Sequence, residues 1–171
     1  MGLPALWQAQ RSIFQTVVQI KGRALQAEAE LLTAEFKRCG ALQDVLLRYT
    51  HALCTQVAQS AMCNRFHTLE ERLCRWLLAS RDRLQTDTLE LTQELISAIL
   101  GSTRSHVTLT AGVLQSAGLI SYKRGVVTLR DHEGLTETAC ECYSVVKEEF
   151  ASLAQFGEKP GRITISEGNP Q

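Results

Sequence analysis

Apolar residues recur every three to four positions over much of the chain, which is the spacing of one face of an α-helix. The longest such stretch, from Ala41 to about Phe66, lacks glycine and proline and predicts one continuous helix. A further helix is predicted to begin at Thr68, because TLEE at 68–71 has the form of a capping box. Shorter helices are predicted over Ala27–Arg38 and Glu133–Phe156. The helix that begins at Thr68 should bury a stripe formed by Leu69, Leu73, Trp76 and Leu77.

Two regions rich in β-branched residues predict β-structure. Ser12–Ile20 predicts a single strand, which needs partner strands that the nearby sequence does not offer. Ile120–Tyr122 and Val126–Leu129 flank Lys123-Arg124-Gly125 and predict a short hairpin with cations at its tip. Leu84–Leu89 is predicted to be a polar connection. We therefore expect a mainly α fold with a small β component.

The stretch 91–130 combines two short amphipathic helices, a glycine between them and the basic hairpin. We expect Thr92 to cap the first helix, Gly101 to allow a tight turn and Ser102 to cap the second helix. The residues expected to be buried are Leu95, Ile96, Ile99 and Leu100 in the first helix and Val107, Ala111 and Leu114 in the second. Helix, turn, helix and hairpin in this order are the plan of a winged helix-turn-helix.

The chain contains 18 basic and 18 acidic residues, but they are unevenly distributed. Four basic and no acidic residues lie between Ser102 and Arg130, whereas 131–158 contains seven acidic residues and one lysine. A locally positive face favours contact with phosphates whatever the net charge. The candidate DNA contacts lie at the starts of the two helices, on the outward face of the second helix and at the hairpin tip: Thr92, Gln93, Ser102, Thr103, Arg104, Ser105, His106, Thr108, Leu109, Lys123 and Arg124.

Three of these residues have specific expected roles. Arg104 can donate two hydrogen bonds to guanine O6 and N7 in the major groove, and Leu109 can contact a thymine methyl group. Lys123 at the hairpin should contact backbone phosphates, which adds affinity rather than sequence information. The alternative to a DNA-binding surface is that the start of the second helix and the basic turn are simply solvated and bind nothing.

The long helix over Ala41–Phe66 carries a heptad-like stripe. The stripe can pack within its own domain or form the seam of a two-helix dimer, and the length of the helix favours the dimer. The residues expected at the seam are Leu42, Leu46 (or Val45), Tyr49, Leu53, Gln56, Ser60 and Cys63.

Six cysteines raise the question of a metal site or a disulfide. None belongs to a C-x-x-C pair, and the only close pair is Cys140 and Cys142. On a helix these two side chains would point about 200° apart, which suits neither a shared metal nor a disulfide. We therefore expect scattered structural thiols, with no metal and no cofactor, and keep an iron–sulfur or redox sensor as the alternative.

Three segments resemble the Crp/Fnr family of bacterial transcription regulators: LEERLCRWLL (69–78), LTQELISAILGSTRSHVTLTAGVLQSAGLI (91–120) and ACECYSVVKEEF (139–150). The resemblance runs from about Ser12 to Phe156. It implies that the DNA-reading positions are occupied by Thr103, Arg104, Ser105, His106 and Leu109. It implies a remnant of a β-roll sensor domain over 1–39, a dimerisation helix over 40–66 and a winged helix-turn-helix with an extra C-terminal helix over 67–156. The polar residues 157–171 form a tail that we expect to be disordered.

This sequence departs from the family pattern in two respects. Ser105 and Leu109 stand where family members often have Glu and a second Arg, so the preferred DNA sequence should differ from that of the cyclic-AMP receptor protein. Most of the β-roll has no counterpart, since only about Ser12–Leu32 corresponds to its end. The cyclic-nucleotide phosphate-binding segment and an N-terminal cysteine cluster are also absent from the sequence. The chain is therefore either a fragment of a longer regulator or a natural short form.

The leading hypothesis is a cytoplasmic, homodimeric regulator that binds a palindromic site in double-stranded DNA, with RNA polymerase as a further partner. The alternatives are a dimerisation module with little DNA affinity of its own and a cysteine-based redox or metal sensor. We do not expect an enzyme, because no Ser/His/Asp, HExxH or phosphate-loop pattern is present. No apolar run reaches the ~18 residues of a membrane-spanning helix, and the N-terminus lacks the pattern of a secretory signal.

Overall fold

The structure, a computed structural model, describes residues 3–7, 18 and 23–156. The helices are α1 (Leu3–Leu6), α2 (Ala29–Lys37), α3 (Ala41–Phe66), α4 (Leu69–Leu84), α5 (Gln93–Leu100), α6 (Arg104–Ser116), α7 (His132–Thr138) and α8 (Cys142–Phe156). The strands are β1 (Thr88–Glu90), β2 (Ile120–Lys123) and β3 (Val126–Leu129). The predicted mainly α fold with a small β component is confirmed. The strand predicted over Ser12–Ile20, apart from Val18, and the tail Gly157–Gln171 lie outside the described residues.

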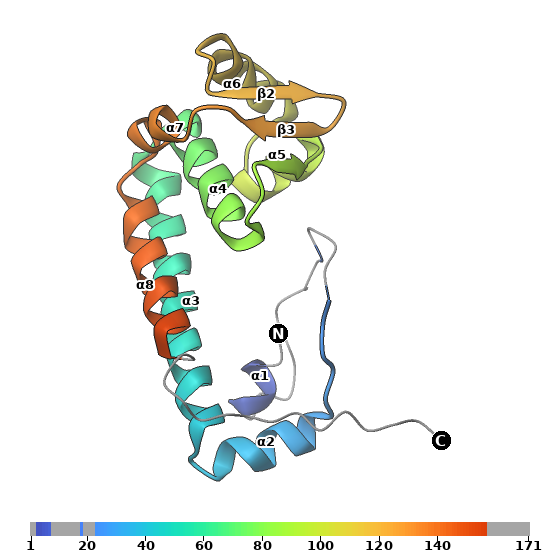
Figure 1. The fold of residues 1–171 in the computed structure, drawn as a ribbon, viewed down its shortest axis with the longest axis vertical. Helices are drawn as coiled ribbons and strands as arrows, with labels where there is room; N and C mark the ends of the chain where they lie inside the picture. The colour runs from blue at the N-terminus through green and yellow to red at the C-terminus, as the bar shows by residue number, and fades with distance from the viewer. Residues whose placement is uncertain (1–2, 8–17, 19–22, 157–171) are drawn as a thin grey trace.

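The long helix α3 forms one side of the molecule, and α8 runs antiparallel beside it (Figure 1). The helices α4 to α7 and the sheet gather at one end of α3, whereas α1 and α2 lie near the other end. The helix predicted over Ala41–Phe66 is confirmed by α3, and α2 lies within the predicted Ala27–Arg38. Only His67 and Thr68 separate α3 from α4, so the chain changes direction within two residues.

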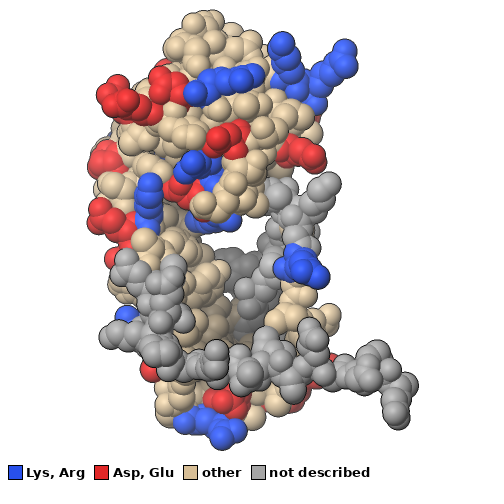
Figure 2. Space-filling view, in the orientation of Figure 1, with Lys and Arg blue, Asp and Glu red and all other residues tan. Residues whose placement is uncertain are grey.

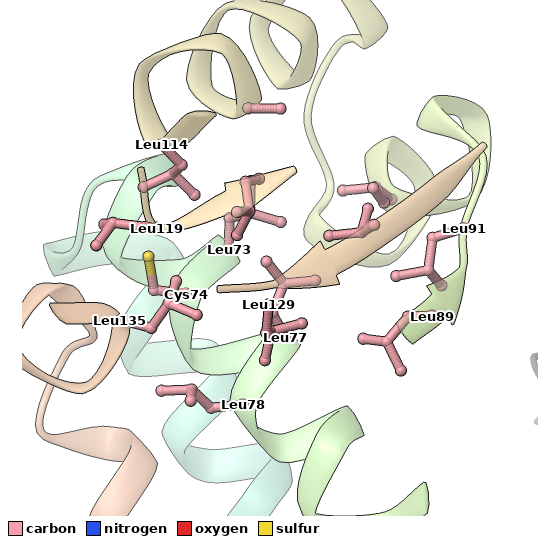
Figure 3. Close-up of a cluster of buried hydrophobic side chains, with 14 of the residues drawn as sticks. Leu73, Cys74, Leu77, Leu78, Leu89, Leu91, Leu114, Leu119, Leu129 and Leu135 are labelled. Atoms are coloured by element: carbon pink, nitrogen blue, oxygen red, sulfur yellow. The ribbon is translucent and has the colours of Figure 1, made fainter. Parts of the chain in front are cut away.

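The core forms around α4, whose predicted apolar stripe is confirmed. Leu73 and Leu77 are at most 1% exposed, Leu69 is also buried, and Trp76 packs against the same core while half-buried. Leucines from α6, the sheet and α7 meet α4 in this core, as Figure 3 shows for Leu114, Leu129 and Leu135. Burial of these apolar side chains fixes the winged-helix elements relative to α4.

The three-stranded sheet is antiparallel, with the order β1-β3-β2. Strands β2 and β3 form the predicted hairpin, and its turn consists of Arg124 and Gly125, with φ of 49° and 77°. Two successive positive φ angles give the backbone twist that a two-residue hairpin needs, and glycine adopts such an angle without steric cost. Lys123 is the last residue of β2, next to the turn.

Strand β1 corrects the prediction that Leu84–Leu89 is only a polar connection. Thr88–Glu90 pairs with β3 and places Leu89 opposite Val127, where Leu89 is 1% exposed. A three-residue strand with one buried side chain between two exposed ones is too short to give a recognisable alternation. Pairing with β3, far along the chain, is what makes this segment a strand.

The single helix predicted over Glu133–Phe156 is wrong, because this region forms α7 and α8 with a break between them. Ala139, directly after α7, has extended backbone, with φ −70° and ψ 148°. The break lets Leu135 of α7 pack into the core around α4, while α8 turns back along α3. Tertiary packing therefore overrides a continuous helical pattern.

The predicted capping box at the start of α4 is present. The Thr68 hydroxyl accepts a hydrogen bond from the Glu71 amide at 3.3 Å, and the Glu71 carboxylate accepts from the Thr68 amide at 2.6 Å and from its hydroxyl at 2.7 Å. These hydrogen bonds from Thr68 favour the ionised carboxylate and lower the pKa of Glu71 below its ordinary value of 4.5.

The capping box predicts a pH-dependent contribution to stability. Because the pKa of Glu71 is lowered in the folded chain, its contribution is fully present above about pH 4.5 and is lost as the pH falls through the lowered value. In Glu71→Gln this acid-dependent loss should be absent, so the melting temperatures of variant and wild type should converge on acidification. Thermal unfolding followed by circular dichroism from pH 7 to pH 3 measures this. Glu70→Gln, which changes a neighbouring carboxylate outside the cap, should keep the wild-type pH dependence.

Candidate nucleic-acid interface

The helix-turn-helix is built from α5, a glycine turn and α6. Thr92 caps α5 as predicted, since its hydroxyl accepts a hydrogen bond from the Leu95 amide at 3.2 Å. Ile96 and Leu100 are buried, and Leu95 and Ile99 pack against the core while half-buried. Gly101 has φ 59°, in the left-handed region that favours glycine, so it ends α5 and turns the chain into α6.

The cap of α6 is Thr103, and the prediction of Ser102 in this role is wrong. The Thr103 hydroxyl accepts from the His106 amide at 3.3 Å. The Ser102 amide instead donates to the Ser97 carbonyl at 3.0 Å, so Ser102 still belongs to the end of α5. Because Gly101 ends α5 in the left-handed region, α6 is capped one residue later than predicted, at Thr103 instead of Ser102.

The two faces of α6 are divided as predicted. Val107, Ala111 and Leu114 are buried against the core, and Thr110 is buried beside them. The opposite face carries an exposed leucine, Leu109, which is 70% exposed. The other exposed side chains at the start of α6 and on its outward face are Thr103, Arg104, Ser105, His106 and Thr108. The candidate DNA contacts at the start of α6 and on its outward face are therefore exposed, apart from the half-buried Ser102.

Arg104, the first residue of α6, interacts with the start of α5. Its guanidinium lies 2.6 Å from the Glu94 carboxylate and donates from Nε to the Gln93 amide oxygen at 3.4 Å. The side chains of Arg104 and Glu94 are 66% and 61% exposed, so this ion pair is weak and can be exchanged for another acceptor. Sequence reasoning missed Glu94, because the turn rather than chain proximity brings the starts of α5 and α6 together.

The start of α5, the start of α6 and the hairpin turn border one hollow of the surface. Its lining combines polar and charged side chains from all three elements: Thr92, Gln93, Glu94, Arg104, Tyr122, Arg124 and Gly125. The Tyr122 hydroxyl donates to the Leu91 carbonyl at 2.9 Å, and the Leu91 amide donates to the Gly125 carbonyl at 2.7 Å. Burial raises the pKa of Tyr122, so the phenol stays protonated at neutral pH and keeps this hydrogen bond. The hairpin is thereby held against the start of α5.

Charge is divided between two flanks of this part of the molecule. Lys and Arg side chains project from the edge where Figure 1 places the β2–β3 turn, and Asp and Glu gather on the side of α7 and α8 (Figure 2). Lys123 and Arg124 at the turn are both exposed. The predicted basic hairpin tip and acidic C-terminal helices are therefore found on different sides.

The stripe predicted as a dimer seam on α3 lies partly against α8 of the same chain. Cys63 is wrong as a seam residue, because it is 0% exposed and its sulfur lies 3.6 Å from that of Cys140. Tyr49 makes an edge-on ring contact with Phe150 of α8. The five other predicted seam residues are half-buried: Leu42, Leu46, Leu53, Gln56 and Ser60. The exposed large apolar residues of α3 are Val45, Leu47, Val57, Met62 and Phe66.

The prediction that Cys140 and Cys142 point apart is also wrong. Cys140 lies in the connection after α7, so the two residues do not share a helix, and both thiols lie close to Cys63. Burial raises the pKa of Cys63 and of Cys140. Cys74 is buried in the separate core around α4, where burial raises its pKa to about 12. Cys39 and Cys54 are exposed.

Fold and surface together define a winged helix-turn-helix, and comparison with known proteins identifies its type. The Crp-like helix-turn-helix domain family matches residues 71–138. A crystal structure of a protein assigned to the Crp/Fnr family of transcriptional regulators, from Eubacterium rectale, is similar to this chain at 24% sequence identity and a TM-score of 0.51. That similarity covers 64% of this chain and 51% of the Eubacterium protein, so this chain spans about half the length of its relative. No curated protein matches the chain.

Residues 71–138 therefore form a Crp-like helix-turn-helix domain, and over these residues the resemblance predicted from the sequence is confirmed. The matched residues include α5, α6 and the hairpin, which carry the candidate DNA contacts. Among the described residues, no helix combines the length and the apolar character needed to cross a bilayer.

Proposed function

We propose that this protein is a sequence-specific DNA-binding transcription regulator that acts as a homodimer. The observation that carries the proposal is the shared hollow described above. The exposed start of α6, the start of α5 and the hairpin turn with Arg124 all border it, and Lys123 lies next to that turn. For one helix to lie in the major groove while a basic hairpin contacts the adjacent DNA phosphates, these elements must lie on one side of the molecule.

In this proposal α6 enters the major groove with its N-terminal residues first. Arg104 exchanges Glu94 for guanine O6 and N7, and Leu109, which is 70% exposed, contacts a thymine methyl group. The remaining α6 residues contact base edges or nearby phosphates. Lys123 and Arg124 contact phosphates beyond the groove, and Thr92 and Gln93 bring the amides at the start of α5 to the backbone.

A second copy of the chain is the proposed partner of α3. α8 covers one face of α3, but Leu47, Val57, Met62 and Phe66 remain 52–65% exposed along it. Pairing two α3 helices would bury part of this exposed apolar surface, including Val57, and would place two α6 helices on one side of the dimer. Two reading helices about 34 Å apart fit a palindromic site, in which successive half-sites face the same side of DNA.

The dimer is tested by placing a charge on the exposed face of α3. Val57→Glu should raise the dimer dissociation constant at least about tenfold, because an unpaired carboxylate in an apolar seam is strongly unfavourable. Sedimentation equilibrium of the full chain measures this constant. Leu25→Glu introduces the same charge at an exposed apolar residue outside α3 and should leave the constant unchanged. A wild-type chain that sediments as a monomer at micromolar concentration would contradict the homodimer.

Selection of bound oligonucleotides from a random pool tests DNA binding and symmetry together. We expect enrichment of an inverted repeat with half-sites one helical turn apart. A gel shift at low and moderate salt then compares the selected site with a scrambled one. Equal, weak binding of both sequences would contradict specific recognition and would favour a module that dimerises without reading DNA.

A further inference from the structure

Four side chains that can each offer one metal ligand meet where the end of α3 faces the start of α8. Cys63 lies in the last turn of α3, His67 directly follows that helix, Cys140 lies in the connection after α7, and Cys142 begins α8. Their ligand atoms all lie within 4.8 Å of one another. The three cysteines are 0%, 5% and 2% exposed, so the sulfurs are shielded from water.

We propose that Cys63, His67, Cys140 and Cys142 bind one Zn²⁺ ion. Three thiolates and one imidazole are a typical ligand set for structural zinc, which takes four ligands in a tetrahedron. The site lies outside the candidate DNA contacts, and the proposal does not depend on DNA binding.

Two of the distances between the ligand atoms are close to those of a tetrahedral zinc site. Zn–S bonds of about 2.3 Å and a Zn–N bond of about 2.0–2.1 Å place ligand sulfurs about 3.8 Å apart, and sulfur and nitrogen about 3.6 Å apart. The sulfurs of Cys63 and Cys140 are 3.6 Å apart, and the Cys142 sulfur lies 3.8 Å from Nδ1 of His67. Within each of these two pairs, the ligand atoms therefore already have nearly the spacing that a zinc ion needs.

The His67 ring has the orientation of a metal ligand. Its Nδ1 faces the thiols, and its Nε2 lies 3.3 Å from the Glu141 carboxylate. A histidine that ligates through one ring nitrogen commonly donates from the other to a carboxylate, which fixes the tautomer and makes the ligand more basic. Glu141 lies between Cys140 and Cys142 in the chain, so the same short connection supplies two ligands and this carboxylate.

Charge balance favours a dication at this position. Zn²⁺ displaces one proton from each thiol, and three thiolates around a dication leave one negative charge. Arg75 of α4 lies near enough to Cys63 and Cys140 to act on both electrostatically, and its Nε is buried without a hydrogen-bond partner. This guanidinium can compensate the remaining negative charge.

The close spacing favours one ion over an iron–sulfur cluster. A cluster places several iron and sulfide atoms between its protein ligands, so it needs a wider separation than the 4.8 Å found here. A single ion would tie the end of α3 to the start of α8, joining segments 77 residues apart in the chain.

Metal titration of the full chain under reducing conditions tests the proposal. The chain is purified anaerobically, stripped with a chelator and titrated with Co²⁺, which reports its ligands through visible absorption. We expect saturation at one ion per chain with the strong bands of tetrahedral, thiolate-bound cobalt, displacement of Co²⁺ by Zn²⁺, and a higher melting temperature with Zn²⁺.

Variants assign the binding to these residues. Cys142→Ser should abolish the tetrahedral cobalt spectrum, whereas Cys54→Ser, an exposed cysteine of α3 outside the cluster, should keep it. Glu141→Gln should lower Zn²⁺ affinity about 10–100-fold with the cobalt spectrum retained. The Glu141 side chain is 76% exposed, so this test remains valid if Cys142→Ser fails to fold.

Three results would overturn the zinc site. The first is a wild-type chain that gives no saturable cobalt spectrum or only that of octahedral cobalt. The second is unchanged cobalt binding in a folded Cys142→Ser chain. The third is a disulfide between Cys63 and Cys140 that persists in the presence of reductant, since it would remove two of the four ligands.

Discussion

Replacing Arg104 by alanine should remove about 1–3 kcal/mol of discrimination at a single base pair, because one side chain supplies both hydrogen bonds to that base. Arg104 begins α6, its side chain is 66% exposed, and it pairs with Glu94 and Gln93 of the neighbouring helix. The substitution therefore leaves the core untouched and should preserve the fold. Fluorescence anisotropy at fixed salt, on the selected site and each of its single-base-pair variants, measures the loss.

Two further variants distinguish sequence-specific base contacts from nonspecific electrostatic attraction to DNA. Lys123→Ala should weaken binding to all sequences about equally and reduce the salt dependence of binding by about one counterion. Glu94→Gln removes the carboxylate that holds Arg104 and should strengthen binding, since one negative charge leaves the interface. If Arg104→Ala bound every sequence as tightly as the wild type, Arg104 would not be the reading residue.

Replacing Leu114 by alanine should lower the free energy of unfolding by about 2–5 kcal/mol, because it leaves a cavity where α6 meets the core. Leu114 is 0% exposed and belongs to the cluster around α4. Leu109→Ala makes the same chemical change on the same helix, but at a side chain that is 70% exposed. It should change stability by no more than about 0.5 kcal/mol.

Chemical denaturation followed by circular dichroism compares the two leucine variants. DNA affinity, measured at a temperature where both variants are folded, should fall more in Leu109→Ala than in Leu114→Ala. Leu109 faces the proposed DNA groove, whereas Leu114 faces the core. Equal stability losses in the two variants would contradict the division of α6 into a buried and an exposed face.

Features that depend on local periodicity could be predicted from the sequence. The limits of α3, the capping box at Thr68, and the buried and exposed faces of α6 all follow from residues within a few turns of one another. The hairpin was also predictable, since its two strands are adjacent in sequence and separated by a glycine-containing turn. These elements include most of the candidate DNA contacts.

Features created by distant parts of the chain could not be predicted in the same way. β1 is a strand only because β3 pairs with it, and the break between α7 and α8 exists because α7 packs on α4 whereas α8 packs mainly along α3. The pair of Arg104 with Glu94 likewise depends on the angle between two helices. The cysteine cluster is the clearest case, since the sequence separates Cys63 from Cys140 by 77 residues.

Only two residues join α3 to α4, and the core around α4 holds α6 in place. A small rotation at this junction would move α6 relative to α3, because α6 is fixed to α4 through that core. In the proposed dimer, in which two chains pair through α3, such rotations would change the distance between the two α6 helices. The spacing of the DNA half-sites that the dimer prefers would then depend on backbone torsion angles at the junction between α3 and α4, which does not contact DNA.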